Sequence, residues 1–62
     1  MDSTALSGRK QIQAYMGRSW ETLLKWRQDL AFPMAMIGDR WESDTRLIEL
    51  WRRGQIKKAV EE

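Results

Sequence analysis

A chain of 62 residues forms one small domain with a thin core, because a domain of this size buries only about 60% of the surface that its unfolded chain exposes. It contains no Cys and no His, which excludes disulfides, thiolate and imidazole chemistry and most zinc sites, so we expect neither an enzyme nor a metal or cofactor site. The net charge is only +2, the apolar runs are too short to span a bilayer, and no signal-peptide pattern is present. We therefore expect a cytoplasmic protein without a membrane partner or an evident small-molecule substrate.

The first predicted elements are a flexible lead-in over residues 1–6 and a helix that begins after Ser7 as its N-cap and runs to about Met16. Helical spacing gives this segment one apolar stripe, formed by Ile12, Tyr15 and Met16. Gly17 follows at the position where a helix often ends in the left-handed conformation. We therefore expect the first helix to stop there.

A second helix is predicted to begin only about two residues later, with Ser19 as its N-cap. Such a short connection forces two helices into an angled corner, which is the outline of a DNA-binding helix-turn-helix. The buried stripe of the second helix consists of Leu23, Trp26 and Leu30. Its opposite side presents Glu21, Lys25 and Gln28, which would reach base edges if the helix entered a major groove.

The segment after Pro33 changes to a strand pattern and predicts a β-hairpin with a type II′ turn at Gly38-Asp39. Its strands are residues 34–37 and 40–43, in a register that places Ile37 opposite Arg40 and Met36 opposite Trp41. The expected core side carries Met34, Met36 and Trp41. A hairpin directly after a helix-turn-helix is a wing whose tip contacts DNA, although a hairpin that only closes the core remains the alternative.

Asp44 is predicted to cap a third helix from Thr45 to about Arg53, with a broad apolar face of Leu47, Ile48, Leu50 and Trp51. Gly54 ends or weakens this helix, so residues 54–62 are predicted to be a helical or frayed tail. Ile56 and Val60 in this tail suit pairing with a second copy. The predicted fold class is mostly α with a small β-hairpin: three helices plus a two-stranded wing over residues 7–53.

Positive charge gathers in the helix-turn-helix, although the middle of the chain is acidic. Residues 7–28 carry one carboxylate, Glu21, against five cations: Arg9, Lys10, Arg18, Lys25 and Arg27. Ordinary solvated surface charge is the alternative reading for each of them.

Residues 6–53 resemble the MerR-like winged helix-turn-helix family of phage and mobile-element proteins, which includes excisionases, AlpA-type regulators and the DNA-binding domains of terminase small subunits. The matching residues are the run 12–17, Ser19, Thr22, Leu23, Trp26, Phe32-Pro33, the wing at residues 38–41 and Trp51. The resemblance implies a sequence-specific double-stranded DNA-binding protein: a transcription regulator, an excisionase or a phage packaging-recognition subunit. It also implies a homodimer or a larger assembly on DNA.

The candidate DNA-binding residues fall into two groups. Bases would be read by Trp20, Glu21, Lys25 and Gln28, and the phosphate backbone would be held by Arg18, Ser19, Arg27 and Arg40. Each has a structural alternative: Ser19 caps its helix, Trp20 folds back onto the first helix, and Lys25 pairs with Glu21. The alternative function is a protein-protein interaction module that uses the Trp20/Leu24 border and the Ile56/Val60 tail.

Overall fold

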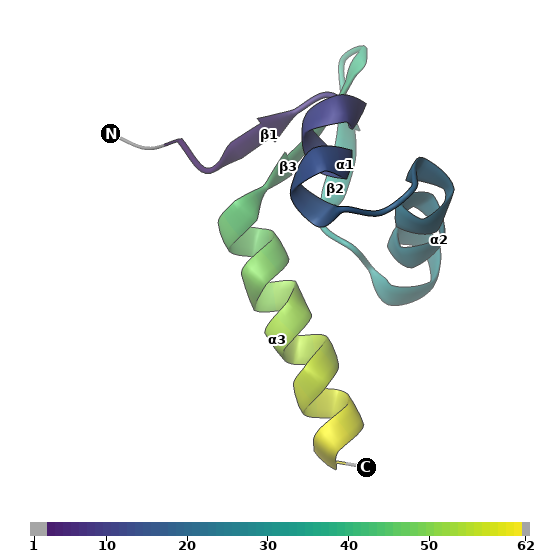
Figure 1. The fold of residues 1–62 in the computed structure, drawn as a ribbon, viewed down its shortest axis with the longest axis vertical. Coiled ribbons are helices and arrows are strands. Elements are labelled where there is room, and N and C mark those ends of the chain that lie inside the picture. Colours follow the sequence, from purple (N-terminus) through teal and green to yellow (C-terminus); the bar gives the residue numbers. More distant parts are fainter. Residues whose placement is uncertain (1–2, 62) are drawn as a thin grey trace.

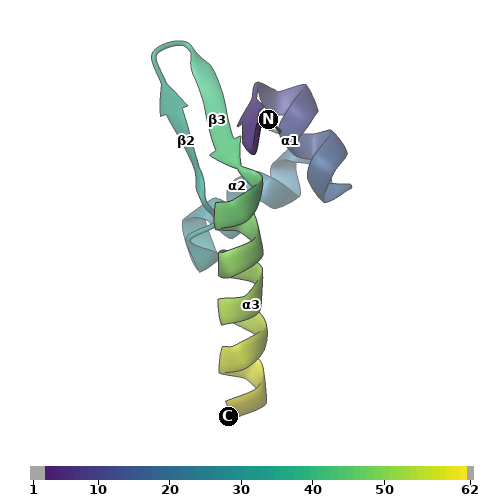
Figure 2. The same ribbon diagram turned by 90° about the vertical axis from the view of Figure 1, so that its left-hand side faces the viewer.

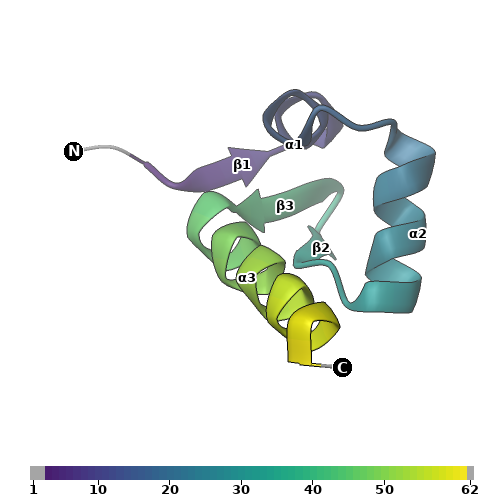
Figure 3. The same ribbon diagram turned by 60° about the horizontal axis from the view of Figure 1, so that its bottom comes forward.

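The computed structural model describes residues 3–61 as three helices and one three-stranded antiparallel sheet, and the chain is mostly helical (Figure 1). The elements in chain order are β1 (Ala5–Ser7), α1 (Arg9–Met16), α2 (Trp20–Leu30), β2 (Met34–Ile37), β3 (Arg40–Asp44) and α3 (Thr45–Glu61). The strand order is β1-β3-β2, and the three helices lie around this sheet (Figure 3). All three predicted helices are therefore present, together with one more strand than the sequence predicted.

The additional strand is β1, which the sequence predicted in part as a flexible lead-in. It pairs antiparallel with β3 in a register that places Leu6 opposite Ser43. Two side-chain hydrogen bonds fix this edge, because Thr4 Oγ1 donates to Asp44 Oδ2 at 2.7 Å and Ser7 Oγ donates to Glu42 Oε2 at 2.7 Å. Leu6 also packs against the core. The segment is therefore ordered by tertiary contacts, which cannot be predicted from its three residues alone.

The start of α1 also differs from the prediction. Ser7 belongs to β1, and the N-cap position is held by Gly8 at φ 88°, with no side-chain cap. Gly8 N–H donates to Trp41 O at 2.7 Å, which joins the start of α1 to β3. A residue with a side chain is strained at this φ, so the chain turns from strand to helix on a glycine.

The remaining caps confirm the predictions. Gly17 ends α1 in the left-handed region at φ 66°, and Ser19 Oγ accepts from Thr22 N–H at 3.2 Å at the start of α2. Asp44 Oδ1 accepts from the backbone N–H groups of Arg46 and Leu47 at the start of α3. α1 and α2 are therefore joined by a short turn and are not parallel, as predicted (Figure 3).

The hairpin formed by β2 and β3 has the predicted register, with Ile37 opposite Arg40 and Met36 opposite Trp41. Gly38 has φ 67°, and Asp39 is not among the residues with positive φ, which agrees with a type II′ turn. The hairpin tip extends away from the rest of the chain at the end opposite the last turns of α3 (Figure 2).

The core consists of five buried side chains contributed by both helices of the corner, the segment before β2, β2 itself and α3: Ile12, Leu23, Phe32, Met34 and Ile48. Partly buried tryptophans surround them, as predicted for Trp26, Trp41 and Trp51. Phe32 and Trp51 meet edge to face with ring centroids 5.0 Å apart, and Trp51 Nε1 donates to Leu30 O at 2.8 Å. Aromatic rings therefore supply much of the packing in this small domain.

Several predicted core positions are wrong, because each element buries a narrower face than its sequence pattern suggests. Leu47 and Leu50 are 54% and 66% exposed, since α3 contacts the domain mainly through Ile48 and Trp51. Met36 is 50% exposed because it lies in β2 directly before Ile37, the last residue before the hairpin turn. Tyr15 and Leu30 are also exposed, being at the ends of their helices.

The third helix is longer than predicted. It continues through Gly54 to Glu61 instead of ending near Arg53, so the helical alternative for the tail is correct. Its last turns extend away from the sheet and from α1 and α2 (Figures 1 and 2). Within residues 3–61 no helix has the length and apolar character needed to cross a membrane.

Two positions hold a residue that does not suit their backbone conformation: a glycine inside a helix and an alanine at positive φ. Each predicts a stabilising substitution. Gly54 lies inside α3 with open space where a Cβ would be, and Ala31 ends α2 in the left-handed region at φ 56°. Gly54→Ala and Ala31→Gly are each expected to raise the free energy of unfolding by about 0.5–1 kcal/mol. Urea unfolding measures both, with Gly38→Ala as the opposite control because its φ of 67° favours glycine. A loss of stability in the first two variants would contradict the backbone assignment.

The cap of α3 predicts a pH-dependent contribution to stability. The hydroxyl of Thr4 donating to Asp44 is the largest cause that lowers the pKa of this carboxyl below its ordinary value of 3.8, assisted by the backbone N–H groups of Leu47 and Arg46 and opposed by burial. A lowered folded-state pKa stabilises the fold above the unfolded-state pKa, and this contribution disappears as the pH falls through the folded-state pKa. In urea unfolding, the stability difference between the parent and Asp44→Asn should therefore be largest near neutral pH and shrink below about pH 4. A difference that is constant with pH would contradict this role.

Candidate nucleic-acid interface

The exposed face of α2 carries three of the four predicted base-reading residues. Glu21, Lys25 and Gln28 are all exposed, and they lie on the side of the helix opposite the buried Leu23. Leu24, at the border of this face, is 38% exposed. The predicted division of α2 into a core face and a polar outer face is therefore confirmed at these positions.

The charge of this outer face is mixed. Lys25 is its cation, whereas Glu21 and the exposed Asp29 are carboxylates. Positive charge is instead found beside α2: on Arg18 in the turn before it, on Arg9 and Lys10 in the first turn of α1, and on Arg40 at the hairpin tip. In protein–DNA complexes, arginines and lysines next to the reading element contact phosphates and set its register, and base edges supply the specificity.

Trp20 packs against the domain, although its ring partner is on β3 and not on the first helix as predicted. Its ring meets Trp41 edge to face with centroids 5.5 Å apart, and the guanidinium of Arg9 lies over it at 5.1 Å from the ring centroid. The side chain therefore joins the start of α2 to β3 at the rim of the core. A role in base contact has no support from this arrangement.

Arg27 also has a structural role. Its Nε donates to Met34 O at 2.9 Å, and its guanidinium lies 5.3 Å from the ring centroid of Trp41. Ile37 and Arg40 flank the two-residue turn and form a hydrogen-bonded pair, and hydrogen-bonded pairs alternate along the strands. The backbone N–H and C=O groups of Met36 and Met34 therefore point away from β3, to the open edge of β2. Met34 N–H donates to Phe32 O, so Arg27 and Phe32 together occupy the edge groups of Met34. This limits edge-to-edge pairing with another strand.

Arg18 and Ser19 form the turn between α1 and α2. Ser19 caps α2, as described above, while the guanidinium of the exposed Arg18 lies 5.7 Å from the ring centroid of Trp26. Stacking restricts the flexible arginine side chain and leaves its charge at the surface. Arg18 is therefore positioned beside the start of α2, where the sequence predicted a phosphate contact.

Arg40 is the first residue of β3 and is exposed at the hairpin tip. The chain places it beside Arg9 and Lys10, because the three line one open hollow of about 430 Å³ together with Asp39. Arg9 and Lys10 belong to the basic residues of the predicted helix-turn-helix, but they were not predicted as site residues. Their nearness to Arg40 depends on the bond between Gly8 and Trp41, for which the sequence offers no signal.

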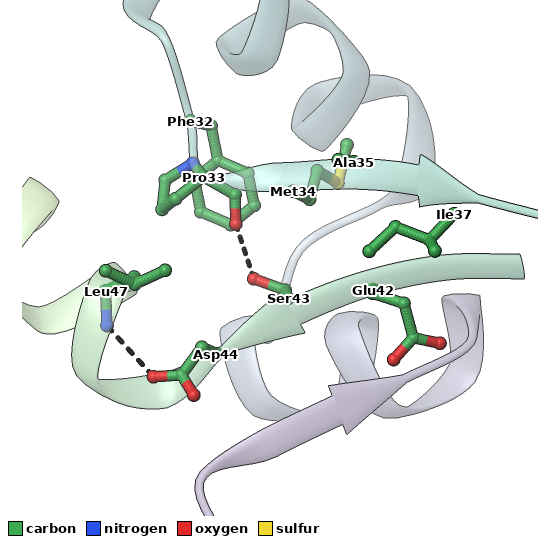
Figure 4. A pocket seen from close by; sticks show the side chains of 9 residues that line it. All are labelled: Phe32, Pro33, Met34, Ala35, Ile37, Glu42, Ser43, Asp44 and Leu47. Carbon is green, nitrogen blue, oxygen red and sulfur yellow. Dashed lines mark hydrogen bonds between the residues drawn. The ribbon is translucent and has the colours of Figure 1, made fainter.

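An apolar groove of about 420 Å³ lies between β2 and the start of α3 (Figure 4). Its apolar lining includes Pro33, Ala35, Ile37 and Leu47. Glu42 and Asp44 lie on β3, across the groove from Pro33 and β2, and Leu47 is next to Asp44. These two carboxylates already accept hydrogen bonds from Ser7 and Thr4. Residues 3–61 contain no cluster of three or more His, Cys, Asp or Glu side chains that suits a metal ion.

Comparison of the chain with family models, with curated proteins and with solved structures finds no match.

Proposed function

We propose that the chain is a sequence-specific double-stranded DNA-binding domain of the winged helix-turn-helix type. The observation that carries this proposal is the corner made by α1 and α2, in which Gly17 and Ser19 fix the turn and α2 keeps Lys25 and Gln28 exposed. The hairpin that follows ends in the exposed Arg40 and corresponds to a wing. This agrees with the resemblance to MerR-like proteins noted from the sequence.

In this proposal α2 enters the major groove and the surrounding cations bind the backbone. Glu21, Lys25 and Gln28 contact base edges, since a carboxylate accepts from cytosine, a lysine donates to guanine and a glutamine pairs with adenine. Arg18 and Arg40 hold phosphates on either side of α2. Trp20 and Arg27 position α2 against β3 and β2, so their contribution to DNA binding is indirect.

Two or more copies act together on DNA in this proposal. One domain of this size covers about one half-site, and useful specificity requires repeated contacts. The exposed Leu50, Ile56 and Val60 on α3 provide apolar surface for association outside the DNA-binding region. The resemblance to MerR-like proteins implies such an assembly for a regulator, an excisionase or a packaging-recognition subunit.

The test is an NMR titration of the isotope-labelled protein with duplexes selected from a random pool. We expect the largest amide shift changes in residues 18–28 and 38–41, with small changes in the second half of α3. Shift changes confined to the apolar groove or to α3 would contradict the proposal.

A second candidate function is binding of another protein chain. Ile37, Leu47 and Leu50 are exposed large apolar side chains, and the first two line the groove of Figure 4. Apolar surface gathered in this way is a feature of interaction sites. Concentration-dependent association in analytical ultracentrifugation without DNA, abolished by Leu47→Ser but not by Leu50→Ser, combined with absence of DNA binding, would favour this candidate.

A further inference from the structure

The hollow between the first turn of α1 and the hairpin tip combines three cations from two separate parts of the chain. Arg9 and Lys10 come from α1 and Arg40 comes from β3, and the lining contains one carboxylate, that of Asp39. Within residues 3–61 the two ion pairs that form both lie on α3. None of the three cations is therefore neutralised by a carboxylate within 4.0 Å in this part of the chain.

The packing of the domain fixes the backbone of α1 next to β3 and restricts the guanidinium of Arg9. The hydrogen bond from Gly8 to Trp41 O holds the start of α1 against β3. The guanidinium of Arg9 lies over Trp20, and Trp20 in turn packs against Trp41. A stacked guanidinium loses less conformational freedom when it binds a ligand than a free one does. The arrangement is therefore suited to bind an anionic ligand.

The open shape of the hollow favours a phosphodiester backbone over a small enclosed anion. The hollow is wide, with about 430 Å³ of space, and its cations are on separate elements. It also borders α2, because Arg9 lies over Trp20, the first residue of that helix. A strand that runs from the start of α2 to the hairpin tip passes over Arg9 and Lys10 before it reaches Arg40.

We propose that Arg9 and Lys10, together with Arg40, bind the phosphate backbone of the duplex beside the segment that α2 reads. This inference rests on the proposed function and extends it, since it assigns a continuous backbone-binding track to α1 and the hairpin. It assigns no base specificity to Arg9 or Lys10, so their contribution is equal for all DNA sequences.

The experiment measures the dependence of duplex affinity on salt for the parent chain, Arg9→Gln/Lys10→Gln and the control Arg52→Gln/Lys58→Gln. Each phosphate contact contributes about 0.9 to the slope of log affinity against log salt. The Arg9/Lys10 variant should therefore lose about 2 units of slope. Its affinity should fall by the same factor for selected and for mixed-sequence duplexes. The control removes the same charge from the exposed side chains of α3 and should keep most of the slope.

The single variant Lys10→Gln serves if loss of the Arg9 side chain destabilises the domain. It leaves the stack of Arg9 on Trp20 intact. This variant should lose about 1 unit of slope with an unchanged thermal midpoint. Asp39→Asn, which removes the carboxylate from the hollow, should raise duplex affinity several-fold.

The outcomes separate this inference from the proposed function. If the parent binds duplex and Lys10→Gln and Arg9→Gln/Lys10→Gln both keep the parent slope, the backbone track is wrong and the proposed function stands. If the parent does not bind duplex at low salt, the proposed function fails first. A titration with inorganic phosphate alone distinguishes a DNA backbone from a free anion. If phosphate binds at Arg9 and Lys10 at millimolar concentration, and substitution of these residues does not change duplex affinity, the hollow is a site for a free anion.

Discussion

Leu23→Ala is expected to remove a large part of the free energy of unfolding and to lower the thermal midpoint strongly. Leu23 is fully buried at 0% exposure and packs with Ile12, Phe32 and Ile48 at the centre of the core. Truncating a buried leucine costs about 2–5 kcal/mol, because the transfer free energy of the removed carbons is lost and a cavity remains. A domain of this length has a total stability of only roughly 3–9 kcal/mol. Thermal unfolding monitored by circular dichroism measures the effect.

The matched control is Leu24→Ala, one residue further along the same helix. Leu24 is 38% exposed on the outer face of α2, so its truncation should cost less than about 1 kcal/mol while changing helix propensity in the same way. Equal destabilisation by the two variants would mean that α2 is not oriented as described.

Lys25→Ala is expected to weaken duplex binding about tenfold or more, since a contact from a recognition helix is worth about 1–3 kcal/mol. Lys25 is exposed on α2, so the thermal midpoint should stay nearly unchanged. Arg18→Ala should weaken binding as well, but it also removes the stack on Trp26, which makes Lys25 the cleaner test. Fluorescence anisotropy with labelled duplex measures the affinity.

Two control variants frame this result. Lys58→Ala removes an exposed cation from α3 and should leave affinity almost unchanged. Arg27→Ala should instead lower the thermal midpoint, because Arg27 bonds to Met34 O and stacks on Trp41. If Lys25→Ala binds as tightly as the parent chain, α2 is not the recognition helix.

Local signals in the sequence predicted the elements that depend on a few neighbouring residues. Ser19, Asp44 and Gly17 occupy the predicted caps, and Gly38 supplies the positive φ of the predicted hairpin turn. These features follow from backbone conformation and short-range hydrogen bonds. The corner and the hairpin could therefore be placed before the structure was known.

The features that the sequence did not predict depend on contacts between distant residues. β1 forms because Thr4 and Ser7 bond to side chains on β3, about 35–40 residues away along the chain. The α3 pattern predicted burial of Leu47 and Leu50, but the helix meets the domain along a narrower line. The helix also continues through Gly54, since one glycine lowers helix stability by only about 1 kcal/mol.

The candidate site was predicted only in part, because some of its features also depend on contacts between distant residues. Periodicity correctly assigned Glu21, Lys25 and Gln28 to the exposed face of α2. It did not reveal that Arg27 is used to hold the edge of β2, or that Arg9 and Lys10 lie beside Arg40. Those relations arise only when β3 packs against the start of α1.

The most direct test of the central claim is fluorescence anisotropy of a labelled mixed-sequence duplex titrated with the protein at about 50 and about 200 mM salt. We predict micromolar binding at the lower salt and a loss of orders of magnitude in affinity at the higher salt, because phosphate contacts release condensed counterions. Absence of binding at the lower salt would contradict the assignment of this chain as a DNA-binding domain.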